Sequence, residues 1–495
     1  MAIEKKNSYR NILKGTAIFG GVQVFNIIIN LVRGKLVAMI LGPEGMGISS
    51  LLTTASTTIQ QATSLGINSS AVRNISNSNE NDTPQETGHL IKAVRRITFL
   101  TSLSGAIITI FFSKWLSQIT FGNNDYQWAF ILLSLFIFFS TLTNGESCIL
   151  QGFRKLKSLA LRSTIGPICG LVIGIPLYYW KGYDGIVPAM ITIAIISFLF
   201  IRYGTLKIQL NKVHQSWKQT WTIGKSIIAL GIIMMIAVFI GNLSTYSLNS
   251  FIRSFGSLTD VGLFQAANSI TNQYTGLIFA AMAMDYYPRL STVIEDNIKL
   301  KEYVNQQAEM VLLVVVPIAT IIIITAPIII QILLTDQFYT ILPIMRFMGL
   351  GVIFKAICFP LGYISVAKGD KTYYFCTEGI YVNIKTFLIH AIFYYYWGVY
   401  GLGIASLTNS IIDIFVSSLL TKWRYNITFS VSFLKLCIYL IPMAVLCFCC
   451  SFIDNAYLSY GVMTSCACCI CIYSFIELNK RILVKDFLLK KLKRK

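Results

Sequence analysis

The sequence has few charged residues and almost no histidine. Only 13% of its 495 residues are charged, whereas 55% are hydrophobic. Apolar runs long enough to cross a bilayer recur along nearly the whole chain, which is typical of a polytopic membrane protein. The composition therefore excludes a soluble protein built around a single core.

The sequence also lacks the motifs of most enzyme classes. His89, His214 and His390 form no HxxxH or HxH pair, and neither a phosphate-binding loop nor a D-x-D motif is present. Twelve cysteines occur, but those near the C-terminus alternate with apolar residues, so we interpret them as small hydrophobic side chains. With no long loop for a catalytic domain, we expect a transporter without a metal or other cofactor, and not an enzyme.

The apolar runs predict an all-α integral membrane protein with about 14 transmembrane helices. No cleavage site follows the first run within signal-peptide length, so we expect this span to be retained. The predicted spans are roughly residues 12–41, 47–70, 91–113, 126–150, 160–180, 184–203, 224–252, 260–286, 306–334, 340–367, 372–397, 400–421, 431–452 and 456–477.

Lysine and arginine are distributed unevenly around these spans. With loops assigned to alternate sides, 33 of the 41 Lys and Arg residues fall on one side, and only Lys114, Lys181 and Arg253 fall on the other. Loops rich in these cations stay in the cytoplasm, so both termini are predicted to be cytoplasmic. Because the cations are spread over membrane-flanking loops, we expect contact with anionic membrane lipids and no nucleic-acid partner.

A shift of 215–217 residues aligns the first half of the chain with the second. The segment LGPEGMGIS, residues 41–49, falls on GSLTDVGLF, residues 256–264, and Trp180 falls on Trp397. Six spans per half predict two parallel, repeat-related six-helix lobes around a central cavity. The predicted domains are an N-terminal lobe at 1–205, a C-terminal lobe at 206–425, and two extra helices with a basic tail at 426–495.

Four of the predicted spans carry polar side chains spaced three and four residues apart, which places them on one face of each helix. In the repeat, the first and second spans correspond to the seventh and eighth. The polar faces consist of Gln23, Asn26, Asn30 and Arg33; Ser50, Thr53, Thr57 and Gln60; Asn242, Tyr246, Asn249 and Arg253; and Gln265, Asn268, Asn272 and Thr275.

These polar faces have two interpretations. Hydroxyl and amide side chains can join neighbouring helices within a membrane by hydrogen bonds. Arg33, in contrast, lies roughly two turns inside its span, and a charge at that depth faces water or the interior of a bundle. Because of Arg33, we predict that the four faces line a hydrated cavity between the lobes.

Further charges lie near mid-depth of the tenth to twelfth spans. Lys355 and Lys385 are candidate cavity cations, but a structural pair between one of them and Asp413 is the alternative, since buried charges are usually paired. The candidate cavity cations are then Arg33, Lys35, Arg253, Lys355 and Lys385.

Several segments resemble the O-antigen and lipid III flippases, the Wzx-type polysaccharide exporters of the MOP superfamily. They are FGNNDYQ (121–127), QGFRK (151–155), GYDG (182–185), YPRLS (287–291) and LGYISVAKG (361–369), and the likeness extends over roughly residues 10–425. It implies export of a polyprenyl-pyrophosphate-linked oligosaccharide, such as the O-antigen of lipopolysaccharide, from the inner to the outer leaflet of a bacterial cytoplasmic (inner) membrane by alternating access.

The resemblance also concerns the site and its partners. It implies cations in the central cavity, where Arg33, Lys35 and Arg253 match by position, and it makes other polysaccharide assembly proteins candidate partners. The last two predicted spans depart from the twelve-helix core of the family.

A MATE-type multidrug or cation antiporter is the main alternative. It would need acidic residues deep in the first half, but Glu44 falls in a turn. Glu146 falls near the cytoplasmic end of its span, where we expect a structural role. A membrane polysaccharide polymerase would need a large external loop, and the sequence contains none.

Overall fold

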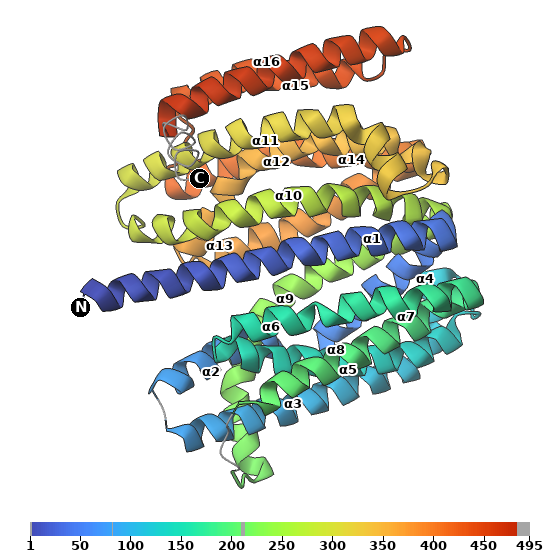
Figure 1. Ribbon diagram of the computed structural model, residues 1–495, viewed down its shortest axis with the longest axis vertical. Helices are drawn as coiled ribbons and strands as arrows, with labels where there is room; N and C mark the ends of the chain where they lie inside the picture. Colours follow the sequence, from blue (N-terminus) through green and yellow to red (C-terminus); the bar gives the residue numbers. More distant parts are fainter. Residues whose placement is uncertain (1, 82, 209–212, 483–495) are drawn as a thin grey trace. The chain divides into compact units, whose positions relative to one another are not determined.

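The structure is a computed structural model that describes residues 2–81, 83–208 and 213–482. The side chains of residues 2–24, 68–69, 80–81, 226, 229–230, 233–234, 284–285, 288 and 482 lie outside this description. The described residues form helices and contain no β-strand (Figure 1). The helices are α1 (Ala2–Thr63), α2 (Ile67–Asn81), α3 (Pro84–Phe111), α4 (Ser113–Phe121), α5 (Gln127–Gly152), α6 (Leu156–Ser163), α7 (Ile165–Lys181), η1 (Gly182–Gly185), α8 (Ile186–Leu206), α9 (Trp217–Phe255), α10 (Leu258–Thr292), α11 (Asn297–Leu333), η2 (Asp336–Ile341), α12 (Leu342–Ala367), α13 (Lys371–Tyr374), the π-helix η3 (Phe375–Tyr381), α14 (Val382–Tyr425), α15 (Val431–Cys450) and α16 (Ala456–Ile482).

Helix α1 is broken where the sequence separates the first two predicted spans. Gly42 has φ 64° and ψ −169°, and Pro43 follows it. Glycine adopts this backbone conformation without a steric penalty, and proline cannot donate the hydrogen bond that would continue the helix. Two helical segments therefore meet at this point, between the predicted spans 12–41 and 47–70.

Two pairs of backbone breaks recur at the distance of the sequence repeat. Gly182 has φ 55° and ψ −129°, and its repeat partner Gly398 has φ 57° and ψ −143°. Arg154 has φ 55°, and Gly369 has φ 64°. The same rare conformations thus interrupt the helices at corresponding places in the two halves, which supports an internal duplication.

The described chain is that of an all-helical, multi-pass membrane protein. Within the part of the chain that the structure describes, ten helical segments are long and apolar enough to cross a membrane. Three of these ten segments are interrupted, by the breaks at Gly42, Gly182 and Gly398. Helix α10, with 35 residues, is not one of the ten segments. The total of fourteen spans and the cytoplasmic termini stay predictions.

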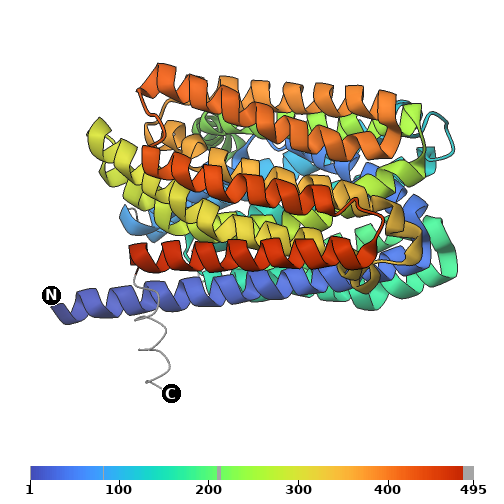
Figure 2. The ribbon, with the colours of Figure 1, turned by 90° about the horizontal axis from the view of Figure 1, so that it is seen from above.

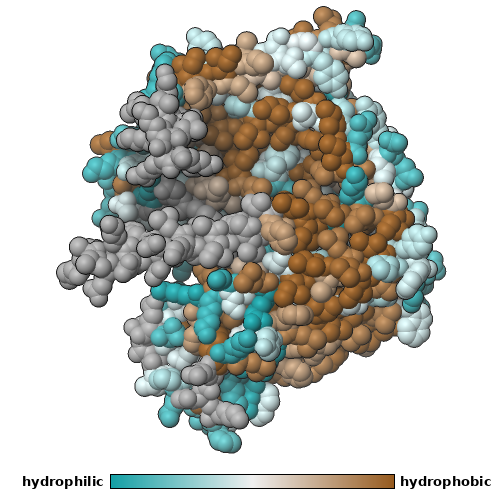
Figure 3. Space-filling model, in the orientation of Figure 1, coloured by the Kyte–Doolittle hydropathy of each residue, from teal (hydrophilic) through white to brown (hydrophobic). Residues whose placement is uncertain are grey.

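Large apolar side chains gather on the surface of these helices. Figure 3 shows broad hydrophobic areas with hydrophilic residues beside them. Broad hydrophobic areas on a protein surface are normally covered by lipid or by another protein. All seven tryptophans are exposed by more than half and lie near helix ends or the Gly398 break, as in the aromatic belts of membrane proteins: Trp115, Trp128, Trp180, Trp217, Trp221, Trp397 and Trp423.

The chain forms two compact units. Unit 1 contains residues 1–262 with 333–335, and unit 2 contains residues 263–332 with 336–495. The predicted boundaries after residues 205 and 425 follow from the repeat and stay a prediction.

A buried carboxylate joins three helices of unit 1. Glu146 on α5 accepts hydrogen bonds from Arg95 Nε on α3 at 2.9 Å and from Arg202 Nη1 on α8 at 2.5 Å. Thr205 Oγ1 also donates to it at 2.5 Å. Two arginines and a hydroxyl neutralise and solvate the carboxylate, which agrees with the structural role predicted for Glu146.

The last two helices belong to the core of unit 2. Leu440 on α15 and Ile470 on α16 are fully buried in one cluster with Leu312 on α11 and Ile353 on α12. Figure 2 shows α15 and α16 as red ribbons joined by a short turn. Arg481 at the end of α16 also forms an ion pair with a carboxylate of α11, at 2.8 Å. The two C-terminal helices are therefore part of this unit and not an appended hairpin.

Candidate functional site

The polar face of the first half of α1 carries an unneutralised cation. Arg33 is partly exposed and lies nine residues before the break at Gly42. No described carboxylate forms an ion pair with it. On the same face Asn30 is exposed, and the buried Oδ1 of Asn26 has no hydrogen-bond partner. This face of α1 thus offers a free guanidinium and amide groups.

Two further residues predicted for the α1 site, Gln23 and Lys35, are not placed on this face by the structure. The side chain of Gln23 lies outside the described residues. Lys35 is partly exposed but follows Arg33 by two residues, and such residues point to different faces of a helix. Arg33 and Lys35 therefore do not share a face of α1.

The polar face of the second half of α1 is used partly for packing against other helices and is partly open. Asn249 on α9 donates to Ser50 Oγ at 3.3 Å, and Gln60 donates to Ser140 Oγ on α5 at 3.1 Å. These side chains hold helices of unit 1 together. Between them, Thr53 is exposed and Thr57 is partly exposed. Only the middle of this face is therefore open to a ligand.

The polar face of α9 is largely used for packing within unit 1. Asn249 is buried against α1, and Tyr246 shares a hydrogen bond of 2.7 Å with Thr120 of α4. Asn242 contributes its backbone carbonyl, which accepts a bond from Thr58 at 3.3 Å. The spacing correctly places these residues on one face, but the neighbouring helices occupy most of it. Arg253 is the member of this set that reaches a cavity.

On α10, in unit 2, the amides remain more open. Asn272 is exposed and donates to Asn268 Oδ1 at 2.9 Å, one helical turn away. Gln265 is partly exposed. Thr275 is buried and donates to the backbone carbonyl of Thr271 at 2.8 Å. This face therefore presents amide groups over about two turns.

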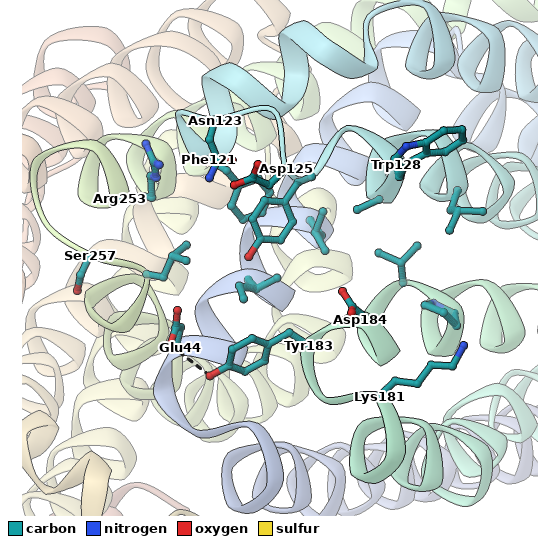
Figure 4. A pocket seen from close by; sticks show the side chains of 18 of the residues that line it. Glu44, Phe121, Asn123, Asp125, Trp128, Lys181, Tyr183, Asp184, Arg253 and Ser257 are labelled. Carbon is teal, nitrogen blue, oxygen red and sulfur yellow. Dashed lines mark hydrogen bonds between the residues drawn. The ribbon is translucent and has the colours of Figure 1, made fainter.

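A cavity of about 1190 Å³ lies at one end of unit 1 (Figure 4). Its walls come from the turn after the α1 break, the α4–α5 connection, η1 with the start of α8, and the end of α9. Tyr183 donates to Glu44 Oε2 at 3.2 Å, and Phe121 stacks on Tyr126 with ring centroids 3.8 Å apart. Arg253 also lines it. Apart from Arg253, the sequence analysis assigned none of these residues to a site.

Unit 2 contains a second cavity, of about 410 Å³, lined by charged side chains. Lys385 forms an ion pair with Asp413, and both side chains are largely buried. Lys355 and Glu378 line the cavity together with Asp413. Of the two alternatives for the lysines, Lys385 is thus the structural partner of Asp413, and Lys355 is the cation that faces open space. Glu378 lies in the π-helix η3, a distortion that often marks functional positions.

Comparisons with known proteins show which family the chain belongs to. Residues 36–343 match a family described as "Polysaccharide biosynthesis protein". The lipid III flippase of Escherichia coli strain K12 is 22% identical over 354 residues, which cover 70% of this chain and 83% of that protein. A Shigella flexneri protein named as a candidate O-antigen transporter is 25% identical over 399 residues, 78% of this chain and 91% of that protein.

Solved structures share the fold at low sequence identity. The lipid II flippase MurJ in an inward closed conformation superposes with a TM-score of 0.70 at 17% identity and covers 94% of this chain and 100% of that one. An inward-facing multidrug resistance MATE family transporter of the MOP superfamily gives a TM-score of 0.65 at 15% identity and covers 84% and 99%. At these identities the likeness shows the fold alone.

Proposed function

The chain belongs to the polysaccharide biosynthesis protein family, and from this premise we propose that it is a flippase for a lipid-linked oligosaccharide. It moves a polyprenyl-pyrophosphate-linked O-antigen or related repeat unit from the inner to the outer leaflet of the bacterial cytoplasmic membrane by alternating access. It is a transporter and not an enzyme. Both termini are cytoplasmic in this proposal, and other polysaccharide assembly proteins are its candidate partners.

Arg33 is the observation that carries the proposal. A pyrophosphate and a glycan cannot cross hydrocarbon alone, because their charges and hydroxyls would lose their hydrogen bonds to water. A guanidinium can bind phosphate oxygens with two parallel hydrogen bonds, and amide and hydroxyl groups can bind sugars. Arg33 has no ion-pair partner among the described residues and shares its helix with the open polar residues Asn30 and Thr53. These features suit an anionic substrate head group.

Two acids of unit 1, the buried Glu146 and the exposed Glu44, argue against a carrier of cationic drugs. Glu146 is already neutralised by Arg95 and Arg202. Glu44 lies in the turn after the break in α1 and binds Tyr183. A cationic drug beside Arg33 would meet a like charge, which disfavours binding. The MATE-type function is therefore the weaker proposal.

Reconstitution into lipid vesicles tests the proposal. The vesicles contain the purified protein and the polyprenyl-pyrophosphate-linked oligosaccharide of the bacterium that produces it. Periodate added outside the vesicles oxidises every glycan that it reaches. With a flippase nearly all of the glycan becomes accessible with time, whereas protein-free vesicles expose only the outer-leaflet share. Equal oxidation in both samples, together with protein-dependent transport of ethidium, would favour the MATE-type function instead.

A further inference from the structure

Two segments that carry the family resemblance meet at the cavity of unit 1. FGNNDYQ, residues 121–127, supplies four lining residues, and GYDG, residues 182–185, supplies two. Figure 4 shows side chains from both segments around the same space, together with Glu44. The two segments lie far apart in the sequence, and neither belongs to the polar faces with Arg33. The cavity is therefore a separate feature that the proposed cation site leaves unexplained.

The lining combines aromatic rings with hydrogen-bond acceptors. Tyr126 and Tyr183 supply ring faces and hydroxyls, and Glu44, Asp125 and Asp184 supply carboxylates. Sugar rings have an apolar C–H face that packs on an aromatic ring, and their hydroxyls donate to carboxylate and amide oxygens. The volume of about 1190 Å³ exceeds the roughly 300–1,000 Å³ typical of small-molecule pockets. The cavity thus has room for more than one sugar residue.

One acceptor in this wall has no partner. Asn123 Oδ1 is buried and receives no hydrogen bond. A buried acceptor without a donor is unfavourable, because it has lost its hydrogen bonds to water and gained none in return. The guanidinium of Arg253 lies beside Gly122, where a Cβ would come within 2.1 Å of its Nη1, so the glycine of FGNNDYQ makes room for it. Because this oxygen is closed off from solvent, a sugar hydroxyl in the cavity reaches it only after the Asn123 side chain turns.

The internal repeat shows that the fold does not require these acids. The repeat partners of Glu44, Asp125 and Asp184 in the second half are Thr259, Thr340 and Tyr400. Asn123 likewise falls on Phe338. In this alignment the second half has no carboxylate or amide at these positions, and its nearest acids are Asp260, one residue after Thr259, and Asp336, four residues before Thr340. A ligand of unit 1 accounts for the difference better than helix packing does.

The charges and the position of the cavity narrow the choice of ligand. Three carboxylates outnumber the two cations of the wall, Lys181 and Arg253, which disfavours a pyrophosphate. No group of three or more potential metal ligands exists among the described residues, which disfavours a metal ion. Lys181 and Arg253 are also two of the three cations that the sequence assigns to the outer side.

We infer that this cavity binds the glycan of the transported lipid, separately from its pyrophosphate, at the outer end of unit 1. The inference rests on the proposed flippase function. Tyr126 and Tyr183 pack against sugar rings, and the carboxylates of Glu44, Asp125 and Asp184 accept hydrogen bonds from sugar hydroxyls. The cavity holds the hydrophilic part of the substrate as it leaves the protein.

Direct binding of a glycan without its lipid tests the site. The probe is the host repeat-unit oligosaccharide, released from its pyrophosphate by mild acid, and titration calorimetry measures its binding to the purified full-length protein in detergent. Tyr183→Ala and Asp184→Asn should each weaken binding at least fivefold. Tyr179→Ala and Asp454→Asn are matched controls that leave it unchanged, because Tyr179 is exposed outside the cavity and Asp454 is an exposed residue of unit 2.

The outcomes separate this inference from the proposed function. Absent binding by the parent protein, or equal binding by all four variants, would overturn the glycan site even if the vesicles showed transport. Retained melting temperatures of Tyr183→Ala and Asp184→Asn show that a loss of binding is not a loss of fold. Failure of the vesicle assay with intact oligosaccharide binding would instead reject the flippase function and leave a sugar-binding membrane protein.

Discussion

At the scale of single residues, two lysines of unit 2 have different roles: Lys385 pairs with Asp413, and Lys355 lines the cavity of that unit. Lys385 and Asp413 contact each other, with side chains 9% and 22% exposed. Their repeat partners in the first half are Gly170 and Phe198, so the helix packing of the repeat does not need this pair. The pair stabilises unit 2 only while both charges are present.

We expect that removing one partner of this pair destabilises the protein much more than removing both. Asp413→Leu leaves the Lys385 ammonium buried without its carboxylate, which costs about 3–5 kcal/mol, whereas an apolar replacement of both partners is often nearly neutral. Asp413→Leu should therefore lower the melting temperature in detergent strongly, and the double variant with Lys385→Met should recover most of it. Equal melting temperatures of the single and double variants would contradict the pairing.

At the scale of helices, glycines allow the closest approach of backbones in unit 1. A Cβ on Gly47 would lie 2.0 Å from the carbonyl oxygen of Leu258, and one on Gly262 would lie 1.8 Å from that of Pro43. These glycines are also the two that the repeat aligns. Because a backbone atom blocks each position, a side chain there requires the helices to move apart.

Gly47→Ala should lower the stability of the protein by about 1–3 kcal/mol, the usual cost of overpacking. Gly34→Ala is the matched control on the same helix, since nothing lies within 4 Å of its added Cβ. Alanine in an open helical position is favoured over glycine by about 0.5–1 kcal/mol, so this control should melt at the same or a higher temperature. A Gly47→Ala protein as stable as the Gly34→Ala protein would show that the crossing is looser than described here.

Asp370 links the short helix α13 to the end of α14. It accepts hydrogen bonds from the backbone N–H of Tyr373 at 3.2 Å and from Arg424 Nε at 3.0 Å, and Tyr425 donates to it at 3.2 Å. Burial alone would raise the pKa of Asp370, but these three hydrogen bonds outweigh it and hold the pKa below its usual value. The charged carboxylate is therefore the form that stabilises this connection.

The contribution of Asp370 should depend on pH. A lowered pKa gives stability that is present above the unfolded-state value of about 3.9 and is lost as the pH falls through the lower folded value. Asp370→Asn keeps a capping acceptor but loses the charge, so at pH 7 it should cost about 0.5–1 kcal/mol, as for a partly exposed pair. The difference in melting temperature from the parent should shrink below about pH 4. A difference independent of pH would contradict a role of the charge.

At the scale of the whole molecule, orientation rests on the distribution of cations. The sequence assigns 33 Lys and Arg residues to one side and three to the other. Alkaline phosphatase, active only outside the cytoplasm, should therefore be inactive when fused after Lys495. An insertion of the same reporter at Asp454, in the connection between α15 and α16, should be active. Activity at Lys495 would overturn both the orientation and the even number of spans.

The helices were largely predictable from the sequence because bilayer thickness and side-chain chemistry fix their length and polarity. The break at Gly42 and the repeat of Gly182 at Gly398 also follow from local residues. The hydrogen bond from Asn249 to Ser50 could not be predicted, because helical spacing defines which residues share a face but not which helix packs against that face. The cavity of unit 1 escaped prediction, since its walls come from four distant segments. The segments FGNNDYQ and GYDG pointed to this region, but nothing in the sequence indicated that they lie side by side in the fold.

We propose that Arg33 binds the pyrophosphate of a lipid-linked glycan. A charge-assisted hydrogen bond contributes about 1.5–3 kcal/mol, so its loss corresponds to a factor of roughly ten or more. Arg33→Ala should therefore reduce delivery of the lipid-linked glycan to the outer leaflet at least tenfold. Arg33→Lys should retain part of the activity, because it keeps the charge but loses the two parallel hydrogen bonds.

The decisive measurement is this delivery, normalised to the amount of protein in the membrane, for Arg33→Ala, Arg33→Glu and the control Lys299→Ala. Lys299 is an exposed cation near the start of α11, and its loss should leave transport unchanged. We expect low transport for both Arg33 variants, with Arg33→Glu the lower because it adds a repelling charge. Normal transport by Arg33→Ala, or activity of Arg33→Glu equal to that of the parent, would contradict it.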